Sequence, residues 1–150
     1  MIAATLDGRT FLKMLLVLAE LKLQWTDFQQ EQQVSIISGI ARTISHKPNR
    51  MVTLLPLLID LKVPYNDLHT RISLILRFVI FQVFNGTVPA SNGDINHDGL
   101  LHLITNLSKM GATSFHLGDK AYLRIQEYVT DIKDPVKRKT YAAILTKMSE

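Results

Sequence analysis

The chain has 150 residues, of which 47% are hydrophobic and 20% are charged, and its formal net charge is +4. This length suffices for one domain that buries roughly 70% of its unfolded surface, and the apolar content argues against a disordered chain. The absence of cysteine excludes disulfides, thiolate metal sites and cysteine nucleophiles, and it agrees with a reducing compartment.

The sequence predicts neither a secretory signal nor a membrane span. Asp7 and Arg9 interrupt the N-terminal stretch where a signal peptide would be apolar. The longest apolar run is broken by Arg77 and is far shorter than the ~20 residues of a membrane-spanning helix. We therefore expect an intracellular protein with no membrane contact.

Four stretches of apolar residues repeat along the chain with the spacing of a helix, i, i+3, i+4 and i+7. They begin at Phe11, Met51, Leu100 and Tyr141, so the steps between them are 40, 49 and 41 positions. Self-similarity near 40 residues is typical of stacked helical hairpins, in which each unit buries its apolar face against its neighbours.

A short connector follows each of the first two stretches, reading LQWTDF and VPYNDL. Trp25 and Tyr65 occupy equivalent places in these connectors, as do Asp27 and Asp67. We expect the two aromatic residues to be buried at contacts between units and the two aspartates to cap the helices that follow. Asp119 is the expected cap in the third unit, for a helix that starts near residue 120.

The second helix of each hairpin is predicted from further apolar residues with helical spacing: Val34, Ile36, Ile37, Ile40, Ile44; Ile72, Ile75, Leu76, Val79, Val83; Leu123, Ile125, Tyr128, Val129, Ile132. Residues 72–84 are apolar almost all round, which predicts a helix packed between both neighbours. Their β-branched content favours a strand in isolation, but the equivalence with the other two units favours a helix.

The predicted fold is therefore all-α, a short α-solenoid of about three and a half helical hairpins in one domain over residues 1–150. Its units are approximately 10–48, 49–98 with a loop insertion at 85–98, 99–134, and a half unit at 136–150.

No motif in the sequence predicts catalysis or metal binding. Residues 94–99, DINHDG, resemble the start of a calcium loop, but the twelfth position is Thr105, which cannot supply the bidentate carboxylate. Phosphate-binding, dinucleotide-binding and G-x-S-x-G motifs are absent. We expect a protein that is not an enzyme, with no catalytic residue, metal, cofactor or small-molecule substrate.

Basic residues gather where one predicted unit meets the next. These candidates for RNA binding are Arg42, Lys47, Arg50, Lys133, Lys137, Arg138 and Lys139. Because unit junctions fall along one edge of a solenoid, such residues can form a discontinuous stripe that follows a phosphate backbone. The alternative is that they serve solubility and meet the negative C-terminal ends of helices.

The last predicted helix has an apolar stripe and, outside it, small side chains that would let another helix approach closely. Tyr141, Ala142, Ala143 and Thr146 are therefore the candidate interface with a partner, which would be a neighbouring protein, a second copy or a continuation of a longer chain.

The repeated unit resembles the octotricopeptide and heptatricopeptide repeats, including the helical part of FAST-kinase-like and RAP proteins. The matching positions are Leu21, Trp25, Phe28; Leu61, Tyr65, Leu68; and Met110, Gly111, Leu117. This chain has Lys22 and Lys62 where that family often has glycine.

The resemblance implies an α-solenoid of organellar RNA metabolism in mitochondria or another organelle. With so few units, it favours a non-catalytic subunit or adaptor of a ribonucleoprotein, such as a ribosome-like particle or an RNA-processing complex, with RNA and other protein subunits as partners. The alternative is a protein–protein scaffold subunit without RNA contact.

Overall fold

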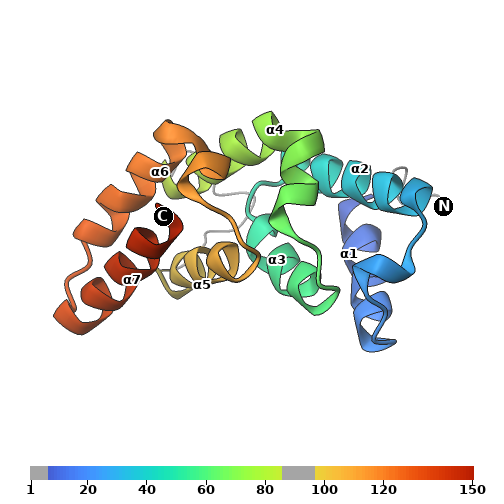
Figure 1. The fold of residues 1–150 in the computed structure, drawn as a ribbon, viewed down its shortest axis with the longest axis horizontal. Helices are drawn as coiled ribbons and strands as arrows, with labels where there is room; N and C mark the ends of the chain where they lie inside the picture. Colours follow the sequence, from blue (N-terminus) through green and yellow to red (C-terminus); the bar gives the residue numbers. More distant parts are fainter. Residues whose placement is uncertain (1–6, 86–96) are drawn as a thin grey trace.

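The computed structural model describes residues 7–85 and 97–150, and this part of the chain consists of helices without strands (Figure 1). The elements are α1 (Gly8–Glu20), the 3-10 helix η2 (Trp25–Asp27), α2 (Gln30–His46), α3 (Arg50–Asp60), α4 (Tyr65–Asn85), α5 (His97–Lys109), α6 (Ser114–Thr130) and α7 (Pro135–Met148). The all-α prediction is confirmed.

The helices form two rows along the long axis of the molecule (Figure 1). In one row α1 contacts α3, α3 contacts α5, and α5 contacts α7; in the other row α2 contacts α4, and α4 contacts α6. This alternation is the arrangement of a short α-solenoid. The prediction that the middle helix packs between both neighbours is confirmed, because α4 contacts α2 and α6.

The first three helices of the α1 row end in the same way. In the first unit the N–H of Lys22 donates to the carbonyl of Ala19 at 2.9 Å, and the N–H of Leu23 donates to the carbonyl of Leu18 at 3.2 Å. These two bonds form a Schellman motif, whose left-handed residue is usually glycine. The equivalent bonds recur after α3 and α5, and the left-handed residues are Lys22, Lys62 and Gly111, with φ of 60°, 59° and 87°.

Two of these three left-handed positions carry a side chain that disfavours the conformation, which leads to a prediction. Lys22→Gly and Lys62→Gly should each raise the free energy of unfolding by about 0.5–1 kcal/mol, since glycine avoids the steric cost at positive φ and loses part of that gain to backbone entropy. Urea unfolding measures the effect. Lys22→Ala is the control and should bring no gain; equal effects of alanine and glycine would contradict the prediction.

The connectors join each unit to the next by an equivalent backbone hydrogen bond. The N–H of Trp25 donates to the carbonyl of Leu61 at 2.7 Å, and the N–H of Tyr65 donates to the carbonyl of Met110 at 3.0 Å. Each acceptor lies at the C-terminal end of the next unit's first helix, where carbonyls lack partners inside the helix. Trp25 is 3% exposed and Tyr65 is fully buried, so the prediction that both pack at contacts between units is confirmed.

The second row bends near the start of each unit's second helix. In the first unit the short η2 precedes α2; α4 is kinked at Ile72, with φ −131° and ψ 35°; α6 is kinked at Gly118, with φ 81° and ψ 159°. Each unit therefore begins its second helix with a short segment at the inter-unit contact and continues in a different direction.

The predicted helix caps are wrong in the first two units. Asp27 accepts the N–H of Gln24 at 2.8 Å and so caps η2, whereas α2 is capped by a reciprocal pair of Gln29 and Gln32. The Asp67 carboxylate accepts the indole N–H of Trp25 at 2.8 Å. A short polar side chain after an aromatic residue thus serves contacts between units as readily as it serves a helix end.

In the third unit α6 begins at Ser114, earlier than predicted, and Thr113 with His116 caps it in place of Asp119. Helix α5 also begins earlier than predicted, at His97, and within it the Thr105 hydroxyl donates to the carbonyl of Leu101 at 3.1 Å. Most of the loop insertion, residues 86–96, lies outside the described residues, as does the start of the calcium-like string.

Candidate functional site

The first group of predicted RNA-binding residues lies where α2 passes to α3. Arg42 is exposed on α2, whereas Lys47 and Arg50 are half-buried at the junction itself. The Arg50 guanidinium packs against Gly8 at the start of α1, so closely that a side chain on that glycine would overlap it. Hydrogen bonds from Thr10 lower the pKa of the Asp7 carboxyl, and the charge of Arg50 adds a smaller contribution. Arg50 therefore belongs in part to the packing of α1 on α3.

The second group lies where α6 passes to α7. Lys133, Lys137 and Lys139 are exposed. Arg138 is exposed too, but its Nη1 donates to the carbonyl of Ile132 at 2.9 Å, so this guanidinium also holds the junction. The N-terminus of α7 is already capped by Asp134, which accepts the N–H of Val136 at 2.9 Å.

The two groups do not merge into one surface. Figure 1 places the α6–α7 junction at one end of the long axis and the α2–α3 junction nearer its middle. The equivalent junction between them, from α4 to α5, contains residues 86–96 outside the described part of the chain. The structure thus places three exposed lysines at the α6–α7 junction, apart along the long axis from the α2–α3 junction.

The residues expected to form a partner interface lie on α7. Ala142, Ala143 and Thr146 are exposed and Tyr141 is half-buried. On the opposite side of this helix Leu145 and Met148 are buried, and the helix packs against α5 and α6. The small-residue side of α7 is therefore open to solvent, and its role as an interface stays a prediction.

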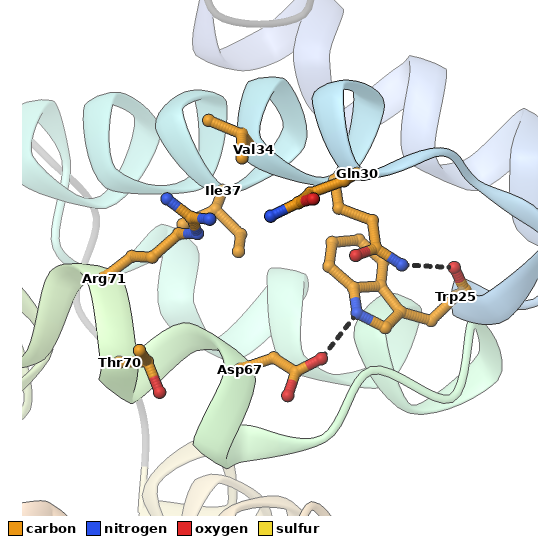
Figure 2. Close-up of a pocket in the computed structure, with 8 residues that line it drawn as sticks. Trp25, Gln30, Val34, Ile37, Asp67, Thr70 and Arg71 are labelled. Atoms are coloured by element: carbon orange, nitrogen blue, oxygen red, sulfur yellow. Dashed lines mark hydrogen bonds between the residues drawn. The ribbon is translucent and has the colours of Figure 1, made fainter.

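A groove that sequence reasoning did not predict lies between α2 and α4, with a volume of about 370 Å³. Figure 2 shows the Trp25 indole in it, donating to Asp67, while Arg71 extends from α4 toward α2. The Gln33 amide donates to the carbonyl of Trp25 at 2.9 Å. The groove is lined largely by polar side chains, of which Trp25, Asp67 and Gln33 are joined by these two hydrogen bonds.

The repeat produces an equivalent groove between α4 and α6, with a volume of about 400 Å³. Leu74 lines it at the position equivalent to Val34, and Lys120 lines it at the position equivalent to Arg71. This second groove is mostly apolar: Leu74 is 77% exposed and Phe78 is 62% exposed.

Beside this groove, the joint between α4 and α6 is built from aromatic and imidazole rings. The His116 ring lies 5.4 Å from that of Tyr65 and 4.8 Å from that of His69, centroid to centroid. Burial lowers the pKa of both histidines, and the nearby charge of Arg77 lowers both further. A lowered pKa favours the uncharged form of both imidazoles, which suits rings that pack this closely.

Arg77 fixes the first turn of α6. Its Nη2 donates to the carbonyl of Phe115 at 2.8 Å and its Nε donates to the carbonyl of His116 at 3.1 Å. These carbonyls lie directly before the kink at Gly118, where the regular helical bonds are interrupted. The side chain therefore links the groove wall to the joint between units two and three.

The exposed apolar side of α4 had a signal in the sequence. Residues 72–84 are apolar almost all round, which predicted a helix with two covered sides. In the structure α2 and α6 cover two sides, while Leu74 and Phe78 line the groove beside α6 and remain largely exposed. An excess of apolar positions over those needed for two neighbours was the available sign of a further exposed apolar surface.

In the described part of the chain no three His, Asp or Glu side chains are placed to hold a metal ion, and no helix there is long and apolar enough to cross a membrane. No family model matches the chain, and neither the curated proteins nor the solved structures compared with it yield a match.

Proposed function

We propose that this protein is a non-catalytic helical-repeat subunit of a ribonucleoprotein that contacts RNA through its basic junctions. The main contact is the α6–α7 junction, with Arg42 and Lys47 as a second contact. The observation that carries the proposal is the set of three exposed lysines, Lys133, Lys137 and Lys139, at one end of a modular scaffold. Exposed cations of this kind attract phosphates and release counterions.

The resemblance to organellar repeat proteins adds two points to this proposal. The protein acts in an organelle, and the ribonucleoprotein is a ribosome-like particle or an RNA-processing complex. The repeated Schellman ends and the repeated bonds from Trp25 and Tyr65 support a modular architecture of that kind, because nearest-neighbour contacts define a solenoid. Few units offer a short contact with RNA, which suits a subunit that binds within an assembly.

The second candidate function is a protein–protein scaffold, and a separate observation favours it. Leu74 and Phe78 are large apolar side chains exposed one turn apart on α4, and exposed apolar patches of this kind mark interaction sites in soluble proteins.

RNA bound at the α6–α7 junction should show an affinity that depends on salt and that falls when the charges of this junction are reversed. The triple variant Lys133→Glu/Lys137→Glu/Lys139→Glu should bind a fluorescein-labelled oligouridine at least about tenfold more weakly than the wild type at low salt. The slope of log K against log salt should also decrease in magnitude by about 2, at ~0.7 per phosphate contact on a single strand. Fluorescence anisotropy measures both quantities.

The matched control reverses three exposed lysines at the ends of α1, α3 and α5: Lys22, Lys62 and Lys109. This variant has the same net charge and should retain most of the affinity. Equal losses in the two variants would mean that only overall charge attracts the oligonucleotide. Failure of the wild type to bind at low salt would favour the scaffold.

A further inference from the structure

We propose that the groove between α4 and α6 is the docking site for an amphipathic helix of a partner protein with acidic residues beside its apolar face. This surface is distinct from the basic junctions, so the inference does not depend on RNA binding. The groove is lined on α4 by Leu74, Arg77, Phe78 and Phe81, and on α6 by residues 117–121.

The apolar side chains of the groove have the spacing that a helix recognises. Leu74, Phe78 and Phe81 stand at i, i+4 and i+7 on α4 and so form one stripe along its surface. Leu74 and Phe78 are mostly exposed, while Phe81 is half-buried. A groove bounded by two helices with such a stripe accepts a third helix through apolar anchors at i, i+3, i+4 and i+7.

The charge of the groove determines which residues are favourable beside the apolar face of that helix. Lys120 lies with its Nζ 5.5 Å from the centre of the Phe81 ring, and Arg77 donates to neutral carbonyls. Among the described residues, neither forms an ion pair with a carboxylate, although Asp119 also lines the groove. Because no carboxylate is paired with these two cations, they complement Asp or Glu on an incoming helix. Such complementarity raises the specificity and the rate of association.

Two other occupants suit this groove less well. A second copy of this chain would bring another net charge of +4 to the contact, and like charges oppose association. For single-stranded nucleic acid, a stacking platform needs exposed planar rings. Among the residues that line this groove, Phe78, at 62%, is the one exposed ring, and Phe81 is half-buried, so the groove offers no run of rings on which successive bases could stack.

The test is selection from a phage-displayed library of amphipathic helices about four turns long. Their apolar positions are fixed as Leu or Phe, and their flanking positions are randomised over acidic, basic and neutral residues. Selection on the wild-type protein should enrich Asp and Glu at the flanks. A synthetic acidic peptide from this selection should bind wild type at least about tenfold more tightly than Phe78→Asp, as expected for the loss of a central apolar anchor.

Two further variants define the site. Lys120→Glu should weaken binding of the acidic peptide. It should strengthen binding of a counterpart peptide in which Lys replaces each acidic residue. The control Val17→Asp makes the same kind of change at an exposed apolar residue of α1, 52% exposed, and should leave binding unchanged. Circular dichroism melts of every variant separate lost binding from lost folding.

Several results would overturn the proposal. These are no enriched peptide, enrichment of basic flanks, or equal peptide binding by wild type and Phe78→Asp. If the wild type sediments as a dimer and Phe78→Asp as a monomer, the groove binds a second copy. If Phe78→Asp loses oligouridine binding, the groove binds nucleic acid. The triple lysine variant of the α6–α7 junction should bind the peptide as the wild type does, so failure of the RNA proposal is seen separately.

Discussion

Replacing Trp25 by alanine is expected to lower the free energy of unfolding by roughly 3–5 kcal/mol. The indole is 3% exposed and packs edge-on against Phe28, with ring centroids 6.2 Å apart. Its N–H is bonded to Asp67 in the next unit. The substitution therefore removes a large buried ring and leaves the Asp67 carboxylate without its donor.

Urea unfolding followed by circular dichroism measures this loss, and two variants separate its parts. Trp25→Phe keeps an aromatic ring but removes the N–H, so it should cost less than alanine. Leu74→Ala removes an apolar side chain that is 77% exposed and should change stability by no more than about 0.5 kcal/mol. A cost for Trp25→Ala as small as that of Leu74→Ala would contradict the assignment of Trp25 to the inter-unit core.

The repeat was predictable because the same positions of each unit are buried and must therefore be apolar. Equivalent positions such as Leu15, Leu55 and Ile104 must be apolar to fill the core between neighbouring helices, and all three are fully buried. The equivalence of Trp25 and Tyr65 followed from the same logic. A pattern that repeats every 40 residues or so reports contacts between neighbouring units, and those contacts determine the fold.

The local geometry was less predictable because one residue type serves several structures. Asp67 in a connector suits a helix cap and equally suits a bond to an indole 42 residues away, and only the tertiary contact decides between them. The kink at Ile72 likewise had no local signal, since isoleucine is compatible with a straight helix. The kink at Gly118 had one, because a glycine inside a helical pattern permits positive φ.

The candidate sites show the same limit. The sequence alone placed Lys133, Lys137 and Lys139 at a junction between units. This prediction needed no tertiary detail, because an exposed lysine is compatible with many surroundings. The sequence did not separate these lysines from Arg138 and Arg50, whose guanidiniums are committed in part to a carbonyl and to the surface of α1. The α4–α6 groove was not predicted because a groove is defined by two helices whose relative placement the repeat period does not specify.

Replacing Gly118 by alanine is expected to lower the free energy of unfolding by about 2–4 kcal/mol. The glycine has φ 81° and ψ 159°, a region that residues with a Cβ avoid at a cost of about 1–3 kcal/mol. A Cβ there would also lie 3.1 Å from Nε and 3.2 Å from Cδ of Arg77. Arg77 would have to move, and its bonds to the carbonyls of Phe115 and His116 would weaken.

Gly111→Ala is the matched control for this prediction. Gly111 also has a positive φ, 87°, but a Cβ there would meet nothing within 4 Å, so its substitution reports backbone strain alone, about 1 kcal/mol. The excess at Gly118 should shrink in an Arg77→Ala background, because the crowded side chain is then gone and the pair is coupled. Equal costs at the two glycines, or no coupling to Arg77, would show that the kink of α6 does not depend on this clamp.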